Sequence, residues 1–124
     1  MEKRTTILIA EDNDLNYHYL EIVLRKDHNL LWAKNGKEAV EMALAADDIS
    51  LVLMDHMMPE LTGIEALKLI KAQKPQLPVV LLTAFDFDSG RNEALNEGAD
   101  FYVSKPIRLK DLKELIAKIF NNDK

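Results

Sequence analysis

The fold is decided by an apolar run that ends in an acid, Leu51-Val52-Leu53-Met54-Asp55. Similar runs occupy residues 7–10, 30–33, 79–82 and 101–103. These runs do not alternate between apolar and polar residues, which is typical of strands buried on both faces. Such strands belong to parallel sheets with a layer of helices on either side, so the runs predict an α/β fold.

The segments between the runs have the periodicity of helices, with apolar residues three or four positions apart. The first helix is marked by Leu15, Tyr19, Ile22 and Val23, the second by Ala39, Val40, Ala43 and Leu44, the third by Ile64, Leu67 and Ile70, and the last by Leu109, Leu112, Leu115, Ile116, Ile119 and Phe120. Residues 86–97 contain few large apolar side chains. A fourth helix there is expected to pack loosely, which would make it the segment most able to move.

Length and composition limit the functions that the chain can have. Its 124 residues fit one domain, which we assign to residues 1–124. The net charge of −5 argues against direct binding to nucleic acid, which requires a basic surface. The absence of cysteine excludes a disulfide scaffold, a zinc–thiolate site and a thiol nucleophile. No apolar stretch is long enough to span a bilayer and no secretory signal opens the chain, so we expect a cytoplasmic domain that does not contact a membrane.

Residues suited to phosphoryl chemistry follow four of the five runs. Glu11 and Asp12 follow the first, Asp55 the third, Thr83 the fourth and Lys105 the fifth. The carboxyl ends of parallel strands meet at one edge of a sheet, where ligands bind, so these side chains are expected to share one cleft. Each has an ordinary explanation taken singly, such as the capping of the first helix by Asp12 or its neighbours. Capping does not explain why acids, a hydroxyl group and a lysine together follow four of the predicted strands.

Three carboxylates in one cleft need a counter-charge. At about 5 Å they would repel each other by roughly 3 kcal/mol per pair at an effective dielectric constant near 20. A lysine offsets part of this repulsion and a divalent cation offsets more, and a site built only from oxygen ligands suits Mg²⁺. A carboxylate nucleophile, a metal, a lysine and a hydroxyl donor are together the parts that phosphoryl transfer requires.

Over essentially its full length, the sequence resembles the receiver domain of bacterial two-component response regulators. The resemblance is carried by Glu11-Asp12, Asp55-His56-Met57-Met58-Pro59-Glu60-Leu61-Thr62-Gly63, Thr83-Ala84 and Lys105-Pro106, in this order at the ends of predicted strands. It implies a flavodoxin-like (βα)5 three-layer sandwich with a parallel sheet of strand order 2-1-3-4-5.

The resemblance also implies a phosphoacceptor site. Asp55 would accept a phosphoryl group from a phosphohistidine of a histidine kinase or phosphotransfer protein. Asp12 and Asp55 would bind Mg²⁺ together with the main-chain carbonyl group of Met57, and Glu11 would hold a water molecule of the ion. Such a domain helps to catalyse its own modification but turns over no substrate, so it is not an enzyme.

The same resemblance implies a conformational switch. Lys105 would pair first with Asp55 and then with a phosphoryl oxygen, while the hydroxyl group of Thr83 would move onto another phosphoryl oxygen. Tyr102 occupies the position whose ring turns inward when the threonine moves. The signal would leave through the face formed by the fourth helix, the fifth strand and the fifth helix, towards an unknown downstream protein.

The family includes both stand-alone regulators and receivers joined to kinases. Asn16, three residues after Asn13, makes the chain similar to receivers of hybrid sensor histidine kinases. The chain ends at Lys124 without an effector domain. We therefore expect either a stand-alone regulator or a piece of a hybrid kinase, and we favour the second.

Three other functions are alternatives for a chain with these features. A haloacid-dehalogenase-type phosphatase needs a second aspartate two residues after the nucleophile, where this chain has Met57. A flavodoxin-type electron carrier needs a loop rich in glycine and hydroxyl groups after the first strand, where Glu11, Asp12 and Asp14 would repel the flavin phosphate. A receiver-like interaction module that works without phosphorylation would not need a competent residue at every phosphoryl-handling position.

Overall fold

The computed structural model describes residues 5–56, 58, 60–83, 98–104 and 107–121. Its strands are β1 (Thr5–Ala10), β2 (His28–Ala33), β3 (Ile49–Asp55), β4 (Val79–Thr83) and β5 (Phe101–Ser104). Its helices are α1 (Asp14–Leu24), α2 (Gly36–Ala45), α3 (Gly63–Gln73) and α5 (Leu109–Asn121). The fourth helix, expected over residues 86–97, lies outside the described part of the chain.

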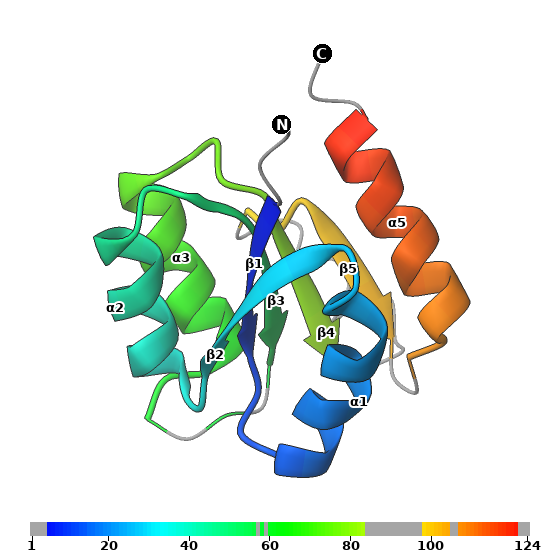
Figure 1. Cartoon of the computed structure of the whole chain (residues 1–124). Coiled ribbons are helices and arrows are strands. Elements are labelled where there is room, and N and C mark those ends of the chain that lie inside the picture. The colour runs from blue at the N-terminus through cyan, green and yellow to red at the C-terminus, as the bar shows by residue number, and fades with distance from the viewer. Residues whose placement is uncertain (1–4, 57, 59, 84–97, 105–106, 122–124) are drawn as a thin grey trace.

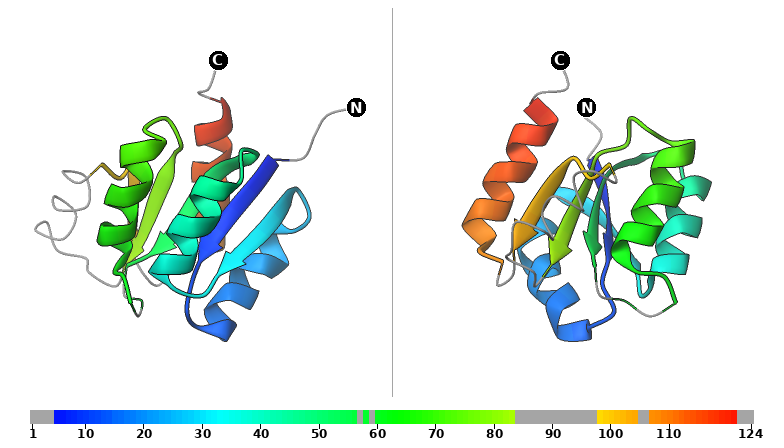
Figure 2. Two further views of the ribbon diagram at one scale, coloured as in Figure 1. Left: turned by 90° about the vertical axis from the view of Figure 1, so that its left-hand side faces the viewer. Right: turned by 180° about the vertical axis from the view of Figure 1, so that it is seen from behind.

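The strands form one sheet in the order β2-β1-β3-β4-β5, and every pair of neighbours is parallel. Helices α2 and α3 cover one face of the sheet, while α1 and α5 cover the other (Figure 1). The two further views in Figure 2 show the same three layers. The predicted α/β class, flavodoxin-like sandwich and strand order are therefore confirmed.

The uninterrupted apolar runs are explained by two separate cores. Alternate residues of each strand point to opposite faces of the sheet. In β1, Leu8 and Ala10 join the cluster under α2 and α3, whereas Ile7 and Ile9 join the cluster under α1 and α5. All four side chains are fully buried. Because both faces are covered, neither set of positions can be polar.

Helix α1 is present as predicted, but its buried side is not the one that the apolar pattern indicated. The side chains that it buries are Tyr17, Leu20 and Leu24. Most of the predicted stripe is exposed instead, with exposed fractions of 80% for Leu15, 49% for Tyr19 and 59% for Ile22. The helix is apolar on two sides, and periodicity alone does not decide which side meets the sheet. In α5, by contrast, the predicted stripe does face the core, through Leu112, Ile116 and Ile119.

The loops between strands and helices are fixed by side-chain caps. Asn13, Asn35 and Thr62 each accept a hydrogen bond at the start of α1, α2 and α3. Thr62 and Glu65 complete a capping box, in which each side chain bonds the other residue's main-chain N–H group. In the described part of the chain, no helix has the length and apolar character needed to cross a membrane.

Candidate functional site

Three acidic residues meet where β1 and β3 end. Glu11 and Asp12 follow β1, and Asp55 is the last residue of β3, the strand beside it. Each offers a carboxylate oxygen, and these oxygens all lie within 4.8 Å of one another. Glu11 and Asp55 are buried, with exposed fractions of 2% and 4%, whereas Asp12 is exposed. The structure thus brings together the three carboxylates that the sequence placed at one edge of the sheet.

Hydrogen bonds in the connection from β1 to α1 position Glu11 and Asp12. The Glu11 N–H group donates to the Ala33 carbonyl oxygen over 2.9 Å, which continues the β1–β2 ladder by one residue. Asn13 is the helix cap, because its side chain accepts a hydrogen bond of 3.0 Å from the Asn16 N–H group. The Asn13 N–H group itself donates to Glu11 Oε2 over 3.3 Å. Since Asn13 does the capping, the carboxylate of Asp12 is left for the acidic cluster.

The main chain that follows Asp55 is also held by hydrogen bonds to neighbouring elements. The His56 N–H group donates to the Leu82 carbonyl oxygen over 2.9 Å, and the Gly63 N–H group donates to the His56 carbonyl oxygen over 2.7 Å. These bonds fix the segment after β3 to β4 on one side and to the start of α3 on the other. The carboxylate of Asp55 therefore stands on a rigid support.

Thr83 lies one strand further along the sheet. Asp55 pairs with Leu82, so Thr83 is the next residue of β4 beyond the acid. Its side chain is buried, with an exposed fraction of 1%. Thr83 is thus at the same edge as the acidic cluster, as the sequence indicated.

Tyr102 lies on β5, beside Leu81 of β4, and its ring packs against the core cluster under α2 and α3. Its hydroxyl oxygen is buried and has no hydrogen-bond partner among the residues that the structure describes. Burying a hydroxyl group without a partner is unfavourable, so this ring position is costly. Lys105 and Met57, for which the family resemblance implies phosphoryl binding and metal binding, lie outside the described residues.

The donor set of the acidic cluster fits a small, hard cation. All its side-chain ligands are carboxylate oxygens, with no nitrogen or sulfur, and their separation allows one ion to contact more than one of them. Two of the three acids are buried, where repulsion between negative charges is poorly screened by solvent. A divalent cation would offset that repulsion, so the residues of this cluster fit a hard ion such as Mg²⁺.

Sequence reasoning missed two residues that support this edge. Trp32 is half-buried, and its Nε1–H group donates a hydrogen bond of 2.8 Å to the main-chain carbonyl oxygen of Glu11. Tyr17 stacks on Trp32, and burial, followed by the negative charge of Glu21, raises the pKa of its hydroxyl group. A signal was available, because the chain has one tryptophan and strand order 2-1 pairs it with Ile9, two residues before Glu11.

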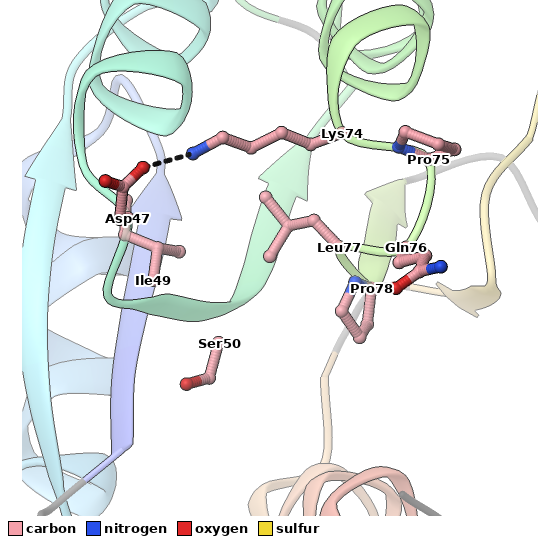
Figure 3. A pocket seen from close by; sticks show the side chains of 8 residues that line it. All are labelled: Asp47, Ile49, Ser50, Lys74, Pro75, Gln76, Leu77 and Pro78. Carbon is pink, nitrogen blue, oxygen red and sulfur yellow. Dashed lines mark ion pairs between the residues drawn. The ribbon is translucent and has the colours of Figure 1, made fainter.

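A groove of about 570 Å³ lies at the opposite edge of the sheet, where β3 and β4 begin (Figure 3). Its charged residues are Lys74 and Asp47, whose Nζ and Oδ1 atoms are 3.9 Å apart. Lys74 also donates hydrogen bonds of 2.8 Å to the carbonyl oxygens of Ala43 and Ala46. This lysine therefore ties α3 to the end of α2, and the groove is remote from the acidic cluster.

Comparison with known proteins agrees with this geometry. The family model described as "Response regulator receiver domain" matches residues 7–117. Histidine kinase P4 of Formosa agariphila is 37% identical over 98% of this chain, which spans only 9% of that protein. The two-component response regulator ORR5 of rice (Oryza sativa subsp. japonica) is 28% identical over 91% of this chain and 87% of its own length.

A solved receiver structure is similar to this chain in its overall fold. The receiver domain of the sensor histidine kinase PA1611 from Pseudomonas aeruginosa superposes with a TM-score of 0.88 at 28% identity, covering 96% of this chain and 99% of that one. That receiver has a magnesium ion coordinated in its active-site cleft. With its fold, its acidic edge and these relatives taken together, the chain belongs to the family of response regulator receiver domains of two-component signalling systems.

Proposed function

We propose that Asp55 is the phosphoacceptor of this receiver and that it takes its phosphoryl group from a phosphohistidine of a histidine kinase or phosphotransfer protein. One observation carries the proposal: Glu11, Asp12 and Asp55 offer oxygens within 4.8 Å of one another at the carboxyl edge of the sheet. Asp55 is the acid at the end of the central strand β3, and it is buried and rigidly supported.

The proposed reaction is a direct transfer. A carboxylate oxygen of Asp55 bonds to phosphorus as the phosphorus–nitrogen bond of the donor breaks, and the donor imidazole leaves with the bonding electron pair. Thr83 and Lys105 supply a hydroxyl and an ammonium donor for the phosphoryl oxygens. Mg²⁺, held by Asp12, Asp55 and the main-chain carbonyl group of Met57 with Glu11 beside them, would neutralise the charge that gathers there.

The product is an acyl phosphate on this chain, so the domain signals by its modified state and turns over no substrate. Tyr102 is the proposed reporter of that state. Its buried hydroxyl group has no hydrogen-bond partner among the described residues. A second position of the ring, in which the hydroxyl group gains a partner, can therefore be close in free energy to the first. A shift of Tyr102 would alter the surface around β5 and α5, through which a downstream protein would read the signal.

The phosphodonor is proposed to contact the exposed apolar side of α1. A donor histidine must reach the acidic edge, and α1 begins two residues after Asp12 at that edge. Leu15, in the first turn, is 80% exposed, and Ile22 is 59% exposed. A helix face of this kind suits the apolar side of a second helix, so the donor surface is expected to be helical. In this proposal the receiver and its phosphodonor meet in the cytoplasm, in keeping with the absence of cysteine from this chain.

Intact-mass measurement after treatment with acetyl phosphate tests the proposal. One added phosphoryl group is expected in the presence of Mg²⁺ and none without it, and Asp55→Asn should remove the addition while keeping the fold. Labelling that persists in Asp55→Asn would assign the acceptor elsewhere. No labelling of the parent would favour the interaction module, and repeated hydrolysis of a chromogenic phosphate ester would favour the phosphatase.

A further inference from the structure

Both main-chain polar groups of Glu11 are bonded to β2. Its N–H group donates to the Ala33 carbonyl oxygen over 2.9 Å. Its carbonyl oxygen accepts a hydrogen bond of 2.8 Å from Nε1–H of Trp32. The first bond continues the regular ladder of the sheet, but the second comes from a side chain and is specific to tryptophan at this position.

The indole ring that makes this bond is itself held in place. The ring of Tyr17 lies parallel to it, with 2° between the planes and 4.0 Å between the centroids. Lys34 Nζ lies over the indole ring, 4.7 Å from its centroid. Stacking and cation–π contacts of this kind restrict the tilt of the ring. The direction of the Nε1–H group is therefore set by α1 and β2 together.

Fixing the carbonyl oxygen of Glu11 has a consequence for Asp12. The peptide unit between the two residues is planar, so the position of that oxygen also fixes the N–H group and the Cα atom of Asp12. From this main-chain position the exposed side chain of Asp12 brings a carboxylate oxygen within 4.8 Å of oxygens of the buried Glu11 and Asp55. Without the indole bond, this peptide unit could rotate and carry Asp12 away from the cluster.

We infer that Trp32 is a positioning residue for the divalent-cation site, acting through the Glu11–Asp12 peptide unit. This inference rests on the proposed function, because it requires that the acidic cluster binds a cation. A group held in its binding geometry beforehand loses less conformational freedom when the ligand arrives. Trp32 thus raises cation affinity without touching the cation.

Calorimetric titration with Mg²⁺ alone, on the complete chain, tests the inference. Trp32→Phe keeps an aromatic ring but lacks the N–H donor, and its affinity for Mg²⁺ should be about fivefold weaker, as expected for the loss of one hydrogen bond. Phe120→Leu is the matched control. Phe120 contacts His28 at the far end of the same strand β2, so this variant loses aromatic packing without touching the β1–α1 connection. Its Mg²⁺ affinity should equal that of the parent.

A second variant separates the hydrogen bond from packing. Benzothienylalanine at position 32 retains the shape of tryptophan and replaces the N–H group with sulfur, so it should weaken Mg²⁺ binding as Trp32→Phe does while melting close to the parent. The chain has a single tryptophan, so one indole N–H signal is expected in a nitrogen-15 NMR spectrum. That signal should shift in step with Mg²⁺ saturation.

The outcomes distinguish the inference from the proposed function. Parent-like Mg²⁺ affinity in the benzothienylalanine variant, or an indole signal unmoved by Mg²⁺, would overturn the role of Trp32 and leave the receiver function standing. Equal weakening in Phe120→Leu would also overturn it, because general loss of stability would then be the cause. A parent that binds no Mg²⁺ would overturn the inference together with the proposed cation site.

Discussion

Gly63 lies so close to Asp55 that a Cβ atom added to the glycine would come within 2.5 Å of the main-chain oxygen of Asp55. The same atom would lie 2.7 Å from the Cα atom of His56. Both neighbours are main chain, which cannot rotate away as a flexible side chain can. The start of α3 therefore packs directly on the segment that carries the proposed acceptor carboxylate of Asp55.

Gly63→Ala should accordingly damage the site as well as the fold. Overpacking against the main chain is expected to destabilise the protein by about 2 kcal/mol and to displace Asp55. Gly98→Ala is a matched control. Gly98 has a φ angle of 110°, so alanine there is strained, but among the described residues its Cβ would meet only Lys71 Cγ, at 3.6 Å. Urea denaturation should show a lower free energy of unfolding for both variants. Labelling by acetyl phosphate should slow only in Gly63→Ala. Equal labelling of the two would contradict the proposed coupling.

Asp12→Asn should have opposite effects on the metal-free protein and on cation binding. It removes one of three negative charges within 4.8 Å. Because Asp12 is exposed and partly screened, the expected gain in metal-free stability is about 1 kcal/mol. Thermal melting in a chelator and in excess Mg²⁺ measures both effects. The variant should melt above the parent in the chelator and should gain less from Mg²⁺. A lower melting temperature in the chelator would show that the acids do not repel each other.

Leu15→Glu tests the proposed donor surface on α1. It places a charge at the end of the exposed apolar side of α1 that lies nearest the acidic cluster, and phosphoryl transfer from a partner protein should slow by about tenfold or more. Labelling by acetyl phosphate needs no docking and should be unchanged. Leu69→Glu on α3 is the matched control, because Leu69 is also an exposed leucine, with an exposed fraction of 48%. Equal slowing in Leu69→Glu would point to a non-specific charge effect.

Lys71 joins three segments at the edge of the sheet opposite the acidic cluster. Its Nζ atom donates hydrogen bonds of 2.7 Å to the Leu77 carbonyl oxygen and to Asp100 Oδ2. The same Asp100 oxygen accepts a hydrogen bond of 2.8 Å from the Val79 N–H group. The lysine side chain is 15% exposed. It therefore connects α3, the turn before β4 and the start of β5.

Lys71→Met should cost about 2–4 kcal/mol of unfolding free energy, because it removes the donor and leaves partly buried acceptors behind. Lys110→Met, on the exposed side of α5, should change stability by less than about 0.5 kcal/mol. Chemical denaturation of both variants provides the comparison. Since Lys71 is remote from the acidic cluster, Mg²⁺ affinity should be the same in both, and a loss in Lys71→Met would contradict that independence.

Tyr17 should make the protein less stable in alkaline solution. Burial, and then the charge of Glu21, raises the pKa of its hydroxyl group above the ordinary value of 10.0. Above about pH 10 the unfolded chain releases this proton while the folded chain keeps it, so stability falls as pH rises. Below that pH both states keep the proton and the contribution is complete. Tyr17→Phe cannot ionise, so its stability should fall less steeply above pH 10; parallel curves in urea denaturation would refute this.

Part of the architecture follows directly from local sequence. Five uninterrupted apolar runs predicted five strands, and each strand contains its run. The strands begin earlier than the runs where a polar residue pairs with a neighbour. Thr5 opens β1 because it lies opposite His28 of β2, and their side chains are hydrogen-bonded. Local hydrophobicity cannot predict such a pair, since its members are far apart in the chain.

The sequence by itself determined the order in which strands and helices follow one another along the chain, and the acidic character of the edge where β1 and β3 end. It could do so because burial on both faces demands unbroken apolar strands, and because parallel strands end at a common edge. Only the tertiary structure decided which side of α1 meets the sheet and how Asp12 is aimed. α1 is apolar on two sides, and the side that meets the sheet is defined by contacts with other elements, among them the stacking of Tyr17 on Trp32. The bond from that indole to Glu11 arises in the same way, from the pairing of β2 with β1.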